Sequence, residues 1–221
     1  MARPTARLKV GVLISGRGSN LLALIDAAAD PAYPAEIALV VSNRPEAPGL
    51  AYAARAGIAH RVIADPNRQA FAAAAAAELR QSGAQLIALA GFMRILDTGF
   101  VEAWHDRLIN IHPSLLPAFP GLHPQRQALA AGVKFSGCTV HFVRAEVDSG
   151  PIIAQAVVPV DAGDDEDRLA ARILAAEHLL YPMAVRLFAE GRLRIAGNRV
   201  TIAGAATPDI AVFNPPGTAS V

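Results

Sequence analysis

The chain has 221 residues, of which 53% are hydrophobic and 18% are charged, and its formal net charge is +1. This composition predicts a globular protein with a substantial core, and the small net charge argues against nucleic acid as a principal partner. With no apolar run long enough to cross a bilayer and no pattern of a signal peptide, we expect a cytoplasmic protein that acts on small molecules, without a membrane partner.

Strand-like and helix-like stretches alternate in the first half of the chain. Short apolar runs predict strands at residues 8–14, 37–42, 59–63 and 86–90. Between them we predict helices that begin at about Ser19 and span residues 49–56 and 68–82. Strands that alternate with helices in this way usually pair in parallel. The expected fold is therefore α/β, a doubly wound, mostly parallel sheet with helices on both faces.

The pattern changes in the second half. We predict strands at 108–112, 136–143 and 151–158, a short helix near 123–131, a long helix at about 166–190, and a hairpin of 193–195 with 200–202. We find no interdomain linker, and we expect one domain over residues 1–203. Residues 204–221 are rich in alanine, proline, glycine and threonine, and they are expected to form a loosely attached C-terminal tail.

A glycine loop, Ser15-Gly16-Arg17-Gly18-Ser19-Asn20, joins the first strand to the first helix. The N-terminus of a helix attracts anions, so an anion is expected in this turn. The loop is not a dinucleotide fingerprint, because Leu21 stands at the third glycine position and no carboxylate ends the second strand. It also lacks the lysine of a Walker motif. We favour a monophosphate site, and the alternative is a turn that serves only tight packing.

The segment of residues 108–117, LINIHPSLLP, ends a buried strand in polar side chains. Asn110 and His112 are two residues apart, so they share one face of the strand, and Pro113 cannot continue a central ladder. Open α/β sheets build their active sites at this carboxyl end of the strands. The alternative is that both residues merely satisfy the backbone of the loop.

Two later loops are further candidates. Residues 91–96, GFMRIL, either form a slot for a flat heterocycle or cover the end of the sheet, in which case Arg94 is a surface cation. Asp148 precedes Ser-Gly and is either a turn former or a carboxylate that orients His112 and favours its charged form. Glu177 lies on the long helix, where an exposed face is the default.

Metal and thiol chemistry are not expected. His123 and His141 have no spacing to His112 that resembles a metal site. Cys138 is the lone cysteine, which fits a reducing compartment, and its position in a strand favours core packing over a nucleophilic role.

The glycine loop, GFMRIL at 91–96, NIHPSLLP at 110–117 and DSGP at 148–151 resemble, in order and spacing, the formyl-tetrahydrofolate transferase and hydrolase superfamily. Within it the chain is most similar to the phosphoribosylglycinamide formyltransferases of purine biosynthesis, over about residues 8–202. The resemblance implies 10-formyltetrahydrofolate as co-substrate, no metal, and a monomer or homodimer. It also implies a phosphate-binding half at about 1–100 and a folate and catalytic half at about 101–203.

The resemblance also assigns roles to residues. The catalytic residues that it implies are Asn110, His112 and Asp148. The residues that it implies for the ribotide phosphate are Gly18, Ser19 and Asn20, and Glu177 is implied to contact the glycinamide end. The implied folate contacts are Arg68, Met93, Arg94, Ile95 and Leu96, with Asn110 reaching the formyl group. The loop 117–125 is expected to close over the site. One departure is Gln125, which stands where the family commonly has a histidine.

Three other functions compete with this one. Methionyl-tRNA formyltransferase normally carries a C-terminal tRNA-binding domain, and formyltetrahydrofolate deformylase normally carries an N-terminal regulatory domain. Here a short tail follows Ile202 and the sheet starts at Leu8, so we expect the ribotide enzyme. A non-enzymatic sensor of a phosphorylated metabolite would leave Asn110, His112 and Asp148 without a role.

Overall fold

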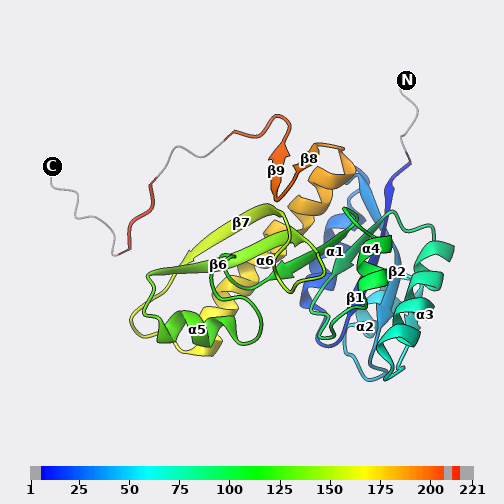
Figure 1. Ribbon diagram of the computed structural model, residues 1–221, viewed down its shortest axis with the longest axis horizontal. Helices are drawn as coiled ribbons and strands as arrows, with labels where there is room; N and C mark the ends of the chain where they lie inside the picture. Colours follow the sequence, from blue (N-terminus) through cyan, green and yellow to red (C-terminus); the bar gives the residue numbers. More distant parts are fainter. Residues whose placement is uncertain (1–5, 207–210, 215–221) are drawn as a thin grey trace.

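A computed structural model describes residues 6–206 and 211–214. Within these residues nine strands form one sheet in the order β3-β2-β1-β4-β5-β6-β7-β9-β8 (Figure 1). Their bounds are β1 Leu8–Ile14, β2 Ala35–Ser42, β3 His60–Val62, β4 Leu86–Leu89, β5 Leu108–His112, β6 Phe135–Phe142, β7 Ile152–Pro159, β8 Leu193–Ala196 and β9 Arg199–Ile202. The pairs β5–β6, β6–β7 and β8–β9 are antiparallel and the other pairs are parallel. The expected mostly parallel α/β sheet is confirmed.

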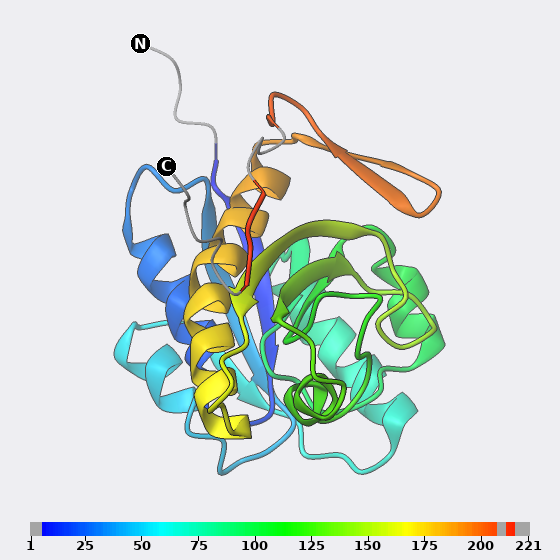
Figure 2. The ribbon, with the colours of Figure 1, turned by 90° about the vertical axis from the view of Figure 1, so that its left-hand side faces the viewer.

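The helices cover both faces of this sheet. Their bounds are α1 Ser19–Ala29, α2 Leu50–Arg55, α3 Arg68–Gln81, α4 Thr98–Ala103, α5 Pro124–Ala130 and α6 Glu166–Ala189. The buried side chains of α1, α2, α5 and α6 belong to one hydrophobic cluster, and those of α3 and α4 belong to a second. Figure 2 shows α6, in yellow to orange, lying beside the blue helix α1 against one side of the sheet. No helix in the described residues is both long enough and apolar enough to cross a membrane.

Side-chain caps define where several helices begin. The Asn67 side chain accepts hydrogen bonds from the backbone N–H groups of the first turn of α3, and the Asp165 side chain caps α6 in the same way. Helix α4 was not predicted from the sequence. It is only six residues long, and its N-terminus is capped by the Asp97 side chain, which accepts from the Gly99 N–H.

Tyr181 connects α6 to the middle of the sheet through hydrogen bonds. Its side chain is completely buried, and its hydroxyl lies 3.0 Å from the Leu89 carbonyl oxygen of β4 and 3.3 Å from the Ile109 carbonyl oxygen of β5. Burial raises the pKa of Tyr181 well above its ordinary value, so the hydroxyl remains a neutral donor. Helix α6 is therefore joined to two neighbouring strands by one polar atom.

Alternation along β5 places its polar residues on one face. Ile109 and Ile111 pack in the first cluster, whereas Leu108 packs in the second. Asn110 and His112 therefore point to the face that α3 and α4 cover elsewhere on the sheet. In the antiparallel ladder with β6, Asn110 pairs with His141 and His112 pairs with Thr139.

The tail that we expected after residue 203 is described in part. The Asn214 side-chain amide donates to the Lys134 carbonyl oxygen at 2.6 Å and to the Val160 carbonyl oxygen at 3.1 Å. These contacts place residue 214 beside the ends of β6 and β7. Residues 207–210 and 215–221 of the expected tail lie outside the described residues.

Candidate active site

The structure brings Asn110, His112 and Asp148 together at the carboxyl end of β5. The His112 Nδ1 lies 3.4 Å from an Asp148 carboxylate oxygen, and both side chains are buried. Asp148 comes from the loop between β6 and β7. Its backbone has a φ of 54°, a left-handed conformation in which aspartate is among the better tolerated residues. The loop at residues 147–150 therefore delivers a carboxylate to the imidazole.

A second loop, residues 117–123, covers this pair. The same Asp148 oxygen accepts the Gly121 N–H at 2.8 Å. The His112 Nε2 lies 3.0 Å from the Phe119 carbonyl oxygen, so both ring nitrogens of His112 face acceptors. An imidazole with an acceptor at each nitrogen can donate to both only when both nitrogens carry a proton.

His141 also lies beside this cluster, and the sequence did not place it there. Its Nε2 lies 3.3 Å from the Asn110 Nδ2 and 3.7 Å from the second Asp148 oxygen. The side chain is buried, with an exposed fraction of 1%. The signal that would have found it is the strand alternation of β6, combined with a register that places residue 141 opposite residue 110.

The glycine loop is tied to the loop of residues 91–96. The Ser15 hydroxyl donates to the Asn43 side-chain oxygen at 2.6 Å and accepts the Met93 N–H at 2.8 Å. Gly18 is the N-cap of α1, with a φ of 75°, and a Cβ there would lie 2.6 Å from the Gly49 Cα. Because glycine offers no side chain to cap α1, the N–H groups of the first turn are suited to an anion.

Asn20 and Glu177 form a buried pair between α1 and α6. The Asn20 Nδ2 donates to a Glu177 carboxylate oxygen at 2.7 Å. Burial raises the pKa of Glu177 to about 7, although the hydrogen bond from Asn20 opposes this shift. The expectation of an exposed Glu177 is wrong, because its side chain faces the core side of α6. The Asn20 Oδ1 is also buried and has no hydrogen-bond partner among the described residues.

The loop of residues 91–96 exposes apolar side chains. Met93 is 70% exposed and Ile95 is 64% exposed, so neither covers the end of the sheet. Arg94 is more than a surface cation, because it donates to the Asp65 carbonyl oxygen at 2.6 Å and its guanidinium lies 4.8 Å from the centre of the Phe71 ring. Leu96 packs against the second cluster, and Arg68 is exposed at the start of α3. Arg94 and Leu96 therefore attach the loop to the rest of the protein, and the apolar side chains of Met93 and Ile95 face solvent.

Cys138 and Gln125 are the remaining candidates from the sequence. Cys138 is buried in β6, and burial raises the pKa of its thiol to about 12, so it is a poor nucleophile at neutral pH. Gln125 lies on the first turn of α5 and is partly buried. Within residues 6–206 and 211–214, no group of three or more histidine, cysteine, aspartate or glutamate side chains is arranged to hold a metal ion.

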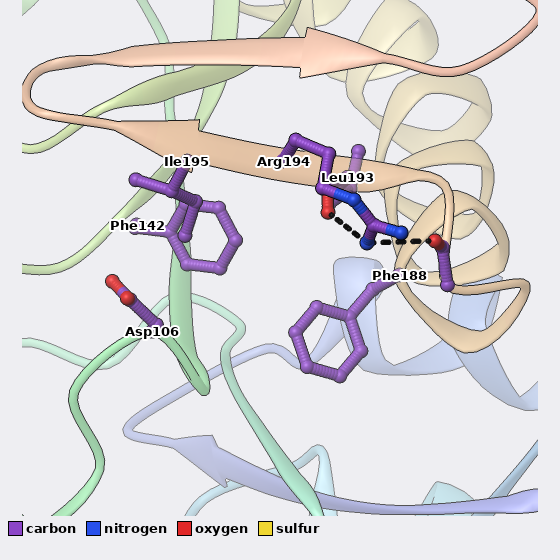
Figure 3. Close-up of a pocket in the computed structure, with 7 residues that line it drawn as sticks. Asp106, Phe142, Phe188, Leu193, Arg194 and Ile195 are labelled. Atoms are coloured by element: carbon purple, nitrogen blue, oxygen red, sulfur yellow. Dashed lines mark hydrogen bonds between the residues drawn. The ribbon is translucent and has the colours of Figure 1, made fainter.

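A hollow of about 330 Å³ lies elsewhere on the molecule (Figure 3). It is lined by Asp106, Phe142, Phe188, Gly191, Leu193, Arg194 and Ile195. Asp106 precedes β5, whereas His112 ends it, so the hollow lies at the opposite end of that strand. Its polar rim is occupied by internal contacts: Asp106 binds Arg144 at 2.6 Å, and the Arg194 guanidinium turns toward the Gly191 and Leu193 carbonyl oxygens. The hollow is separate from the candidate active site.

Known proteins resemble this chain over most of its length. Phosphoribosylglycinamide formyltransferase of Escherichia coli is 46% identical over 91% of this chain and 96% of its own length. The trifunctional purine biosynthetic protein adenosine-3 of Drosophila pseudoobscura is 54% identical over 85% of this chain, but the match spans only 14% of that protein. A crystal structure of glycinamide ribonucleotide transformylase 1 from Symbiobacterium toebii superposes with a TM-score of 0.86 at 54% identity, covering 89% of this chain and 94% of that one.

The family comparison agrees with these matches. Residues 8–185 match the formyl transferase family, which is the part of the chain that contains the glycine loop, the residues 91–96, the end of β5 and Asp148. Strands β1 to β7 and the clustered polar residues lie within this range, whereas β8 and β9 follow it. The chain belongs to the formyl transferase family.

Proposed function

We propose that this chain transfers the formyl group of 10-formyltetrahydrofolate to the amine of 5-phosphoribosylglycinamide. The products are formylglycinamide ribotide and tetrahydrofolate, and the reaction is a step of purine biosynthesis in the cytoplasm. The observation that carries the proposal is the cluster of Asn110, His112 and Asp148 at the carboxyl end of β5. The likeness to the E. coli enzyme, over nearly the whole of both chains, supports the choice of substrate.

The cluster suits attack of an amine on a formyl carbon. The attack creates a tetrahedral oxyanion, which is stabilised by hydrogen-bond donors that are already in place. Asn110 carries an amide N–H, and His112 carries a ring N–H. No covalent enzyme intermediate is needed, because the amine itself is the nucleophile.

Protons must then move from the amine to the folate nitrogen. Asp148 is the acceptor beside His112, so it transfers the proton through the imidazole or through an ordered water. In this structure the His112 Nε2 is hydrogen-bonded to the Phe119 carbonyl oxygen. Substrate binding therefore replaces this contact, and the loop 117–125 closes over the bound substrates and excludes water.

The two substrates have separate binding regions in this proposal. The phosphate binds at the start of α1, at Gly18, Ser19 and Asn20, and Glu177 contacts the glycinamide end. The folate ring lies against the exposed apolar tips of the loop of residues 91–96. The residues proposed to bind the folate are Arg68, Met93, Arg94, Ile95 and Leu96, with Asn110 at the formyl group. Arg94 acts by holding the loop, since its guanidinium is engaged with Asp65.

The direct test is an assay of formyl transfer with purified protein and both substrates. Tetrahydrofolate should form only when the ribotide is present, and formylglycinamide ribotide should form in equal amount. Tetrahydrofolate that forms equally fast without the ribotide would instead indicate a deformylase. Glycinamide riboside without the 5′-phosphate is the matched control, and it should bind far more weakly in calorimetry because the start of α1 loses its anion.

A further inference from the structure

We propose that His141 is a positioning residue for this reaction, which as a neutral imidazole fixes the orientation of the Asn110 side-chain amide. The inference rests on the proposed formyl transfer. It concerns a side chain that the roles assigned above do not use. The Phe142 carbonyl oxygen contacts the His141 ring, and the ring contacts the Asn110 amide.

The first step is the position of the ring hydrogen. The His141 Nδ1 lies 3.0 Å from the Phe142 carbonyl oxygen. A carbonyl oxygen can only accept, so Nδ1 must carry the hydrogen. In a neutral ring the other nitrogen, Nε2, then has a lone pair and acts as an acceptor.

The second step is the orientation of the amide. Asn110 is directly opposite His141 in the antiparallel ladder, and its Nδ2 lies 3.3 Å from the His141 Nε2. The lone pair on Nε2 accepts one of the two hydrogens on Nδ2. Rotating the amide by half a turn would place Oδ1 against that lone pair, and two acceptors would then face each other. The neutral ring therefore leaves the second Nδ2 hydrogen as the donor for the oxyanion.

The third step is the effect of protonation. Burial lowers the pKa of His141, and the nearby His112 lowers it too, whereas the Phe142 carbonyl and the Asp148 carboxylate raise it. Among the residues that the structure describes, Asp148 and His112 are the titratable groups that face the ring. The ladder partners of His141 on β5 and β7 are Asn110 and Ile152, which are uncharged.

A protonated Nε2 would become a donor, and the second Asp148 oxygen lies 3.7 Å away as its acceptor. The Asn110 Nδ2 would then face another donor, so its amide would rotate and withdraw its hydrogen from the oxyanion. Turnover is therefore lost as the pH falls through the pKa of His141. An ionisation of His141 contributes to the acid limb of the pH profile of kcat.

Two variants separate the acceptor from the titration. His141→Leu removes the acceptor, and we expect kcat to fall about tenfold with an unchanged KM for the ribotide. His141→Gln does not titrate, and its amide can donate to Asp148 and accept from Asn110. The glutamine variant should recover most of the lost turnover, and its kcat should stay level to lower pH than that of the wild type. A leucine variant with the kcat and the acid limb of the wild type would overturn the inference.

The second measurement does not depend on activity. Nitrogen-15 NMR of the histidine rings in the ligand-free protein should show His141 with its hydrogen on Nδ1 at pH 7.5. A hydrogen on Nε2, or a charged ring at that pH, would overturn the inference even if both variants lost activity. If the wild type transfers no formyl group, the proposed function fails, while the NMR spectrum still tests the position of the hydrogen.

Discussion

Replacing Glu177 by glutamine should make the protein more stable than the wild type at neutral and alkaline pH. The same substitution should weaken binding of the ribotide. Glu177 is buried on α6, and burial raises the pKa of its carboxyl from 4.5 to about 7. The folded protein therefore keeps a proton that the unfolded chain releases between these two pH values. The Asn20 amide can donate to a glutamine oxygen as it does to the carboxylate, so the variant preserves the contact between α1 and α6.

The size of the effect follows from the two pKa values. A difference of about 2.5 between them corresponds to about 3 kcal/mol, at about 1.36 kcal/mol for each pKa unit. Because the folded state binds more protons in this window, the free energy of unfolding of the wild type falls as the pH rises from 4.5 to 7 and stays lower above it. A glutamine side chain does not titrate in this range, so the free energy of unfolding of Glu177→Gln should not show this decrease.

Urea unfolding of both proteins at pH 4.5 and pH 8 measures the difference. The stability of Glu177→Gln relative to the wild type should be greater at pH 8 than at pH 4.5 by about 3 kcal/mol. Glu102→Gln is the matched control, because it makes the same substitution at a side chain that is exposed on α4. The reasoning is refuted if the wild type and Glu177→Gln lose stability in parallel between the two pH values.

Three further changes test the rest of the site. Asp148→Asn keeps the shape of the side chain and removes its charge, so kcat should fall about 100-fold; near-normal kcat in steady-state assays would remove Asp148 from the proton transfer. Gly18→Ala adds a Cβ 2.6 Å from the Gly49 Cα at a φ of 75°, so stability should fall by at least about 1–2 kcal/mol in urea unfolding and the KM for the ribotide should rise. An unchanged KM would place the phosphate elsewhere. Arg94→Ala releases the loop of residues 91–96 from Asp65, so the KM for the folate should rise while that for the ribotide stays constant. Equal rises in both would show that the change disturbs more than the folate region.

The strand that ends in Asn110 and His112 could be predicted because its signals are local. An alternating pattern and a following proline lie within six residues, and they place both side chains on one face at the end of β5. The burial of Glu177 could also have been predicted from a local pattern in the sequence. Ile173, Glu177 and Leu180 recur at the spacing of one helix face, and an apolar face on a long helix is normally buried.

Other parts of the site depend on contacts between distant residues. Asn20 and Glu177 are 157 positions apart, and no local pattern pairs an amide on one helix with a carboxylate on another. The place of His141 depends on the register between β5 and β6, which side-chain alternation alone does not determine. The covering of Asp148 by Gly121 depends on the path of a proline-rich loop, for which no periodicity exists.

Tyr181 gives α6 a mechanical role. It is four residues after Glu177, so the phenol and the carboxylate project from neighbouring turns on one side of the helix. The phenol hydroxyl is hydrogen-bonded to carbonyl groups of two different strands. Helix α6 therefore cannot slide along its axis or rotate about it without breaking these hydrogen bonds. A shearing of β4 against β5 would pull on the same hydroxyl and displace the carboxylate with it. The position of Glu177 along the helix axis is thus fixed relative to the sheet, because this attachment point is only about 6 Å away along α6.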